Sequence, residues 1–191
     1  QVEVNDFIGR YAEVHPNTSE ADNRYYEGTR YIDQIESMAT SEIIKLANCL
    51  QVDVRPVSGN ASNTAVALAI LRGGDTVIAN SIEVGGHISH SPIGVVGRRI
   101  QIRGNVLTLG RENSINIHYW PTMEDGYHLD VPKCVDLVEQ KSPNMVILGK
   151  SLFLFPEPVR EIAEVCRVKN IPILYDGAHV LGLIFGGQFQ N

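Results

Sequence analysis

The sequence has too few cysteines and too few basic residues for several classes of protein. Its three cysteines, Cys49, Cys134 and Cys166, lie far apart and form no CxxC pair, so neither a disulfide framework nor a zinc site is indicated. We expect them to be buried as small apolar side chains. Lysine and arginine number 16 against 22 acidic residues and are interleaved with them, which argues against a nucleic-acid partner.

Long apolar runs and nucleotide-binding glycine motifs are also missing from the sequence. No stretch approaches the ~20 apolar residues that cross a bilayer, and the N-terminus lacks the charged-then-apolar order of a signal peptide. These absences predict a cytoplasmic protein with no membrane partner. Neither GxGxxG nor GxxxxGKS/T occurs, which argues against a dinucleotide or nucleoside-triphosphate site.

The patterns that are present are those of an α/β protein. With 43% hydrophobic and 20% charged residues, the 191-residue chain has the composition of a globular domain. Apolar periodicity and end signals predict helices over residues 30–48 (with a core-facing stripe), 61–71, 130–138 (capped by Asp130) and 158–168. Apolar or alternating runs predict strands over residues 52–57, 76–79, 99–103, 106–109, 115–120, 145–149 and 171–176. Strands separated by helices predict a three-layer α/β/α fold with a mostly parallel sheet.

Sheets of this kind bind ligands beyond the carboxyl ends of their strands, and the loop SGNASN (58–63) is the first candidate there. Its small residues precede a helix, where backbone N–H groups and the helix dipole can bind a phosphate. An ordinary turn with an N-cap explains the same residues equally well.

Two further loops carry side chains that can contact a ligand. In VGGHISH (84–90), two glycines let the backbone pass close to a ligand and leave His87 free to stack or to hydrogen-bond. His87 and His90 have a spacing that suits a metal, but no further ligand lies near them in the sequence, so we predict no metal site. Asp176 ends a strand and His179 follows, so that the carboxylate can bind a cationic ring nitrogen or cap the next segment.

A phosphate-binding loop, a stacking histidine and a strand-end aspartate, in this order, resemble the pyridoxal-phosphate enzymes of the aspartate aminotransferase fold, known as fold type I. The resemblance is closest to serine hydroxymethyltransferase, also called glycine hydroxymethyltransferase, and runs from about Tyr11 to Gly187. It rests on five segments: RYAEVHP (10–16), RYYEGTRYIDQIE (24–36), VRPVSGNASN (54–63), GGHISH (85–90) and YDGAHVLGL (175–183).

The resemblance implies a transferase of one-carbon and amino-acid metabolism. It would move a hydroxymethyl group between serine and a reduced pterin by retro-aldol chemistry, with pyridoxal 5'-phosphate as cofactor and serine and glycine as substrates. Residues 31–191 would form an incomplete pyridoxal-phosphate-binding large domain. Residues 1–30 would reach the neighbouring subunit's active site, which implies a homodimer or a higher oligomer.

The resemblance also assigns roles to particular residues. Those implied to contact the cofactor are Ser58, Gly59 and Asn60 at its phosphate, His87 stacked on the ring, Ser151, Asp176 at the ring nitrogen and His179 near the phenolic oxygen. The family usually has serine where Asn60 stands. Glu13 matches a glutamate that transfers a proton at the hydroxymethyl group, and Tyr11 and Tyr26 match tyrosines that line the substrate site. With His87 and His179, these three residues are the expected catalytic set.

Departures from the family pattern leave alternatives open. Residues 17–23, 91–99 and 152–155 differ from the common form near the place of the one-carbon carrier, which leaves tetrahydrofolate, a modified pterin or no pterin as co-substrate. A threonine transaldolase or aldolase, or an α-methylserine hydroxymethyltransferase, would share the cofactor residues.

The lysine that carries the cofactor as a Schiff base lies farther along the family's pattern than Asn191. None of the chain's own lysines matches its place, and we expect the isolated chain to be inactive. A lysine-less partner or binding module is the alternative from another class.

Overall fold

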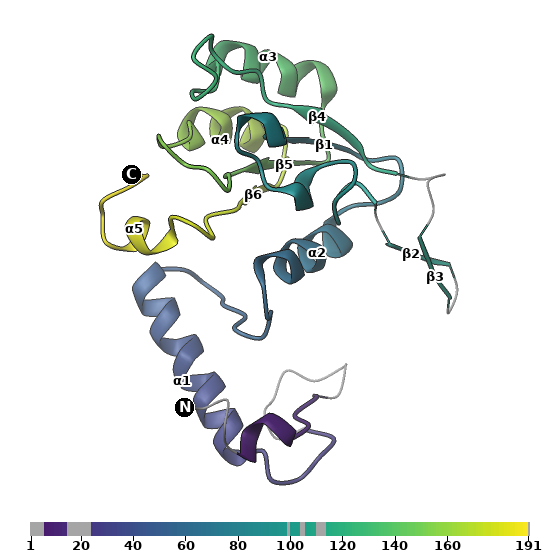
Figure 1. Ribbon diagram of the computed structural model, residues 1–191, viewed down its shortest axis with the longest axis vertical. Coiled ribbons are helices and arrows are strands. Elements are labelled where there is room, and N and C mark those ends of the chain that lie inside the picture. Colours follow the sequence, from purple (N-terminus) through teal and green to yellow (C-terminus); the bar gives the residue numbers. More distant parts are fainter. Residues whose placement is uncertain (1–5, 15–23, 99, 104–105, 110–113, 191) are drawn as a thin grey trace. The chain divides into compact units, whose positions relative to one another are not determined.

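The chain forms two compact units, residues 1–55 and 56–191, each of which is described by itself. The computed structural model describes residues 6–14, 24–98, 100–103, 106–109 and 114–190 (Figure 1). No helix in these residues is both long enough and apolar enough to cross a membrane.

The long helix of the first unit is α1 (Arg30–Ala47), close to the predicted range. It ends at Asn48, which adopts the left-handed backbone conformation (φ 48°) that asparagine tolerates better than most residues. The predicted core-facing stripe is wrong for the described part of the chain, because no residue of α1 is buried there. Apolar periodicity defines one face of a helix, and it does not define what covers that face.

Arg24 joins the segment around Glu13 to α1 within the first unit. Val14 and Arg24 form an antiparallel bridge, and the Arg24 guanidinium donates to the Ala12 carbonyl. The same guanidinium donates to Asp33 at 2.8 Å and to Glu36 at 2.7 Å, both on α1. Only 8% of the Arg24 side chain is exposed, so these ion pairs are better shielded from water than surface pairs.

The second unit contains the predicted parallel sheet. Its strand order is β4 (Asn116–Tyr119), β1 (Thr76–Ala79), β5 (Met145–Leu148), β6 (Ile173–Tyr175), and every neighbouring pair is parallel. A separate antiparallel pair consists of β2 (Ile100–Arg103) and β3 (Val106–Leu109). The expected α/β class is confirmed.

Residues 52–57 were predicted as a strand, and that prediction is wrong: they pair with no strand of the described chain. Pro56 has no N–H to donate to a ladder. The carboxylate of Asp53 instead accepts from both the backbone N–H and the guanidinium of Arg55, so the hydrogen bonds of this segment are local.

Helices cover both faces of the sheet (Figure 1). α3 (Val131–Lys141) and α4 (Val159–Val168) pack on one face, and α2 (Gly59–Ile70) packs on the other. Alternate strand residues point to opposite faces. Ile78, Val146 and Leu148 therefore join Cys134, Val138, Ile162 and Cys166 in one core, while Val77, Ala79, Met145 and Ile147 join Ala67 and Leu71 in the other. Cys134 and Cys166 are buried as predicted, whereas Cys49 is partly exposed.

Side-chain caps fix the starts of two of these helices. Ser58 accepts a hydrogen bond from the Ala61 N–H at 3.1 Å and starts α2, and Asp130 accepts from the Lys133 N–H at 3.3 Å and starts α3. The predicted cap of α3 is thus confirmed. The short helix α5 (Leu181–Phe185), which was not predicted, follows the loop after β6.

Candidate functional site

A cavity of about 280 Å³ lies where the first turn of α2 meets the loops that follow β1, β5 and β6. Parallel α/β sheets bind ligands at this edge. The cavity is lined by every residue that the sequence assigned to the cofactor, namely Ser58, Gly59, Asn60, His87, Ser151, Asp176 and His179, together with Asn63, Lys150 and Ala178. The fold therefore brings together residues from loops that are far apart in the sequence.

The start of α2 forms one end of this cavity. The N–H groups of Gly59 and Asn60 lie in the first helical turn and have no acceptor within the helix. The hydroxyl oxygen of Ser58 already accepts from the Ala61 N–H, so its proton remains available as a donor. These donors and the positive end of the helix dipole suit an anion such as a phosphate.

Asp176 lies directly after β6, and its carboxylate is ionised. Oδ2 accepts from Asn63 Nδ2 at 2.9 Å and lies 3.0 Å from His90 Nε2, and Oδ1 accepts from the Ala178 N–H at 3.3 Å. The hydrogen bond from His90 holds the pKa of Asp176 well below its ordinary value; burial opposes this, and the bond from Asn63 supports it. An ionised, partly buried carboxylate is suited to a cationic partner such as a protonated ring nitrogen.

His90 contacts this carboxylate but does not itself line the cavity. It is completely buried, and its Nδ1 has no hydrogen-bond partner among the described residues. A proton on Nδ1 would therefore be unsatisfied, so we assign the ring proton to Nε2, which donates it to Asp176. The sequence offered His90 only as half of a metal spacing, and its role beside Asp176 was missed.

His87 is one of the residues that line the cavity. Its Nδ1 accepts from the Ser89 N–H at 3.2 Å and lies 2.7 Å from the Ser89 hydroxyl. The preceding glycines were expected to let the backbone pass close to a ligand, which stays a prediction, and the structure adds a packing reason for them. The Gly86 position has room for no side chain, because an added Cβ would lie 2.3 Å from the Asn80 carbonyl oxygen. Gly85 accepts from the Ser151 N–H at 2.8 Å, which joins the His87 loop to the loop after β5.

His87, His90 and Asp176 place nitrogen and oxygen atoms within 4.8 Å of one another, a cluster of possible metal ligands that the linear sequence did not reveal. Binding a metal through His90 Nε2 would move the ring proton to Nδ1. Metal-binding histidines usually donate their second N–H to an acceptor, and Nδ1 has none among the described residues. The arrangement therefore favours the hydrogen bond between His90 and Asp176 over a metal centre.

Lys150 is a cavity residue that the sequence interpretation set aside. It is only 6% exposed, and its ammonium lies 3.4 Å from Glu157 and donates to the Tyr127 carbonyl at 3.2 Å. Its Nζ is thus already engaged by oxygen acceptors. The expectation that the Schiff-base lysine is a different residue stays a prediction.

The expected substrate residues Tyr11, Glu13 and Tyr26 belong to the first unit. The rings of Tyr11 and Tyr26 lie 5.2 Å apart between centroids, and the Glu13 carbonyl accepts from the Tyr25 N–H at 3.1 Å. Their roles stay predictions, as does the division into residues 1–30 and 31–191. Of the segments that depart from the family pattern, residues 17–23 and 99 lie outside the described residues.

A parallel α/β sheet that joins an anion-binding helix start to an ionised strand-end aspartate defines a domain suited to a phosphorylated, cationic ring. Comparison with known families agrees with this class. The model of the serine hydroxymethyltransferase family matches residues 4–191. The chain therefore belongs to the serine hydroxymethyltransferase family.

Individual relatives give the same result. Serine hydroxymethyltransferase of Pyrobaculum arsenaticum is 40% identical over 190 residues, which cover 100% of this chain and 40% of that protein. The enzymes of the same name from Thermococcus onnurineus and Pyrococcus abyssi are each 37% identical over 185 residues, covering 97% of this chain and 39% of each relative. The chain thus spans about 40% of the length of the curated relatives that it matches.

Proposed function

We propose that the protein carrying this chain is a pyridoxal-phosphate-dependent serine hydroxymethyltransferase that interconverts serine and glycine. The family match supports the reaction class. The observation that carries the proposal is Asp176, which is held ionised in the same cavity as the anion-binding start of α2. The alternatives of a transaldolase, an α-methylserine enzyme or an inactive partner receive no comparable support, because the relatives compared above are named serine hydroxymethyltransferase.

The cavity residues fit the cofactor at both of its charged ends. The N–H groups of Gly59 and Asn60, with Ser58, would bind the phosphate, and Asp176 would bind the ring nitrogen. His87 would cover the ring face, and Ser151 and His179 would contact the ring's substituents. When bound, pyridoxal phosphate supplies an electron sink for negative charge at the amino acid's α-carbon.

The protein's own groups then have separable tasks. Asp176 keeps a proton on the ring nitrogen, and His90 and Asn63 hold Asp176 in its ionised form by donating to Oδ2. Glu13 would move a proton at the hydroxymethyl oxygen, and Tyr11 and Tyr26 would line the substrate site. We infer that these three residues act in a neighbouring subunit, which requires a homodimer or a larger assembly.

The other partners belong to the same proposal. Tetrahydrofolate or a modified pterin would accept the one-carbon unit. The net charge of -6 gives no attraction to nucleic acid, and a cytoplasmic location fits the metabolic role.

The test is a comparison of the wild-type full-length protein with Asp176→Asn and with the control Asp136→Asn, which changes an exposed carboxylate on α3. A hydrogen bond between charged groups contributes about 1.5–3 kcal/mol, so Asp176→Asn should weaken pyridoxal-phosphate binding about 10- to 150-fold and greatly reduce glycine formation from serine and tetrahydrofolate. The control should change neither quantity. Failure of the wild-type protein to bind the cofactor would refute the proposal, and activity with threonine and an aldehyde but without a pterin would favour the transaldolase.

A further inference from the structure

Glu157 is a buried glutamate that has no role in the proposed mechanism. The residue is only 4% exposed. Its Oε2 accepts from the Gly149 N–H at 2.7 Å, and its Oε1 accepts from Asn80 Nδ2 at 3.0 Å and lies 3.4 Å from Lys150 Nζ. Asn80 and Gly149 directly follow β1 and β5, so Glu157 connects the carboxyl ends of the two central strands of the sheet.

Gly149, the backbone partner of Glu157, packs directly on the backbone of Asp176. Its φ is 102°, and an added Cβ would lie 2.1 Å from the Asp176 carbonyl oxygen. The Asp176 N–H donates to the Leu148 carbonyl at 2.8 Å, one residue before Gly149. A displacement of Gly149 would therefore displace Asp176 as well.

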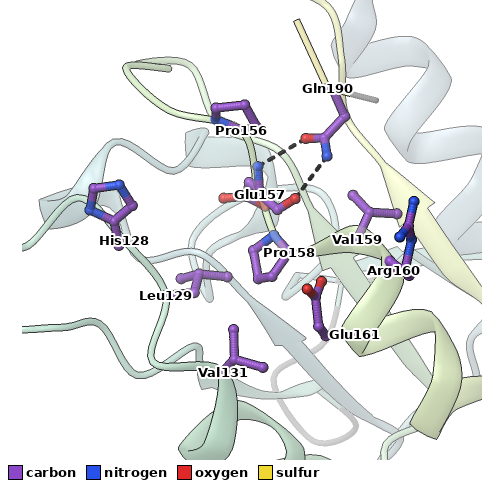
Figure 2. Close-up of a pocket in the computed structure, with 10 residues that line it drawn as sticks. All are labelled: His128, Leu129, Val131, Pro156, Glu157, Pro158, Val159, Arg160, Glu161 and Gln190. Atoms are coloured by element: carbon purple, nitrogen blue, oxygen red, sulfur yellow. Dashed lines mark hydrogen bonds between the residues drawn. The ribbon is translucent and has the colours of Figure 1, made fainter.

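The backbone of Glu157 is held from its other side by Gln190. The Gln190 side chain accepts from the Glu157 N–H at 2.9 Å and donates to the Glu157 carbonyl at 2.8 Å (Figure 2). These contacts line a second cavity of about 420 Å³, which contains none of the expected cofactor residues. Hydrogen bonds thus hold both the main chain and the carboxylate of Glu157 in place. The carboxylate in turn holds Gly149 through the hydrogen bond that it accepts from the Gly149 N–H.

We infer that Glu157 is a positioning residue for the cofactor site: through Gly149 it holds Asp176 at the place where the ring nitrogen binds. This inference rests on the proposed function. Lys150 balances the charge of Glu157. Because Lys150 also lines the cofactor cavity, it connects the hydrogen bonds of Glu157 to that cavity. Glutamine at position 157 would retain one oxygen acceptor for three donors, so the hydrogen bond to Gly149 or those to Asn80 and Lys150 would be lost.

The experiment compares two ligands in the full-length protein: pyridoxal phosphate and its analogue in which a C–H group replaces the ring nitrogen. The wild-type protein should prefer pyridoxal phosphate about 10- to 150-fold, because only this ligand forms the charged hydrogen bond with Asp176. Glu157→Gln should reduce that preference by about tenfold or more. The matched control is Glu161→Gln, an exposed glutamate that lines the same cavity in Figure 2 and has no hydrogen bond to Gly149 in the described chain, and it should keep the wild-type preference.

The ratio of the two affinities separates positioning from general loss of structure. If Glu157→Gln weakens both ligands equally, or weakens neither, the inference is overturned while the proposed function stands. If the wild-type protein shows no preference, the proposed role of Asp176 fails first. Glu157→Gln leaves Lys150 without a counter-charge and could for that reason fail to fold. In that case the double variant Glu157→Gln with Lys150→Met, which removes the unpaired charge, takes its place. If the double variant keeps the wild-type preference for pyridoxal phosphate, the inference is again overturned.

Discussion

Replacing Gly149 by alanine should destabilise the protein through two separate effects at one position. The φ of 102° lies in a region that costs a residue with a Cβ about 1–2 kcal/mol. The added methyl group would also lie 2.1 Å from the Asp176 carbonyl oxygen, and relieving such an overlap typically costs about 1–3 kcal/mol. We therefore expect Gly149→Ala to lower the free energy of unfolding by about 2–5 kcal/mol.

Gly74 provides the matched control for this change. It has a similar φ of 88°, but an added Cβ would meet no atom within 4 Å in the described chain. Gly74→Ala should thus show the backbone cost alone, about 1–2 kcal/mol. Equilibrium urea unfolding of the full-length protein and both variants measures the difference, and titration with pyridoxal phosphate reports whether Asp176 has moved. Equal losses of stability in the two variants would refute the claim that Gly149 packs against Asp176.

Other buried groups of the second unit lead to three shorter predictions. The pKa of Asp176 is lowered by folding, so its stabilising contribution is present above the ordinary value of about 3.9 and is lost as the pH falls; the advantage of wild type over Asp176→Asn in unfolding free energy should shrink below that pH. Burial raises the pKa of Cys134 to about 12 and that of Cys166 to about 11. Both thiols should resist alkylation at mildly alkaline pH until the protein is unfolded, and rapid labelling of the folded protein, read by mass spectrometry, would contradict this. Ile147→Ala should lower the free energy of unfolding by about 2–5 kcal/mol and the exposed Val168→Ala by less than about 0.5 kcal/mol, with denaturation midpoints as the measurement.

Most of the sheet could be predicted from the sequence because its strands are short, apolar and bounded by turn signals. The runs at 76–79 and 145–149 are buried on both faces, which produces an unbroken apolar pattern. The run at 52–57, VDVRPV, has alternating valines, but Pro56 cannot donate to a ladder and strand formation also needs a partner strand, which the local pattern does not reveal. The lack of buried residues in α1 could not be predicted either, since the periodicity of a helix does not identify what covers its apolar face.

The candidate site likewise contains residues that the sequence could predict and residues that it could not. Glycines, a helix cap and a strand-end aspartate mark positions by local signals, and the structure places these residues in one cavity. Asn63 and His90 carry no such signal. Asn63 lies 113 positions before Asp176 in the sequence, and only the fold brings its amide to 2.9 Å from that carboxylate. Lys150 and Glu157 were missed for the same reason, because a buried ion pair is defined by three-dimensional packing.

The position of the ring nitrogen is the most direct test of the account. A crystal structure of the full-length protein with pyridoxal phosphate should place that nitrogen within about 2.7–3.2 Å of the Asp176 carboxylate, with the phosphate at the N–H groups of Gly59 and Asn60. A cofactor bound in the other cavity beside Glu157, or with its ring nitrogen directed away from Asp176, would contradict the central claim.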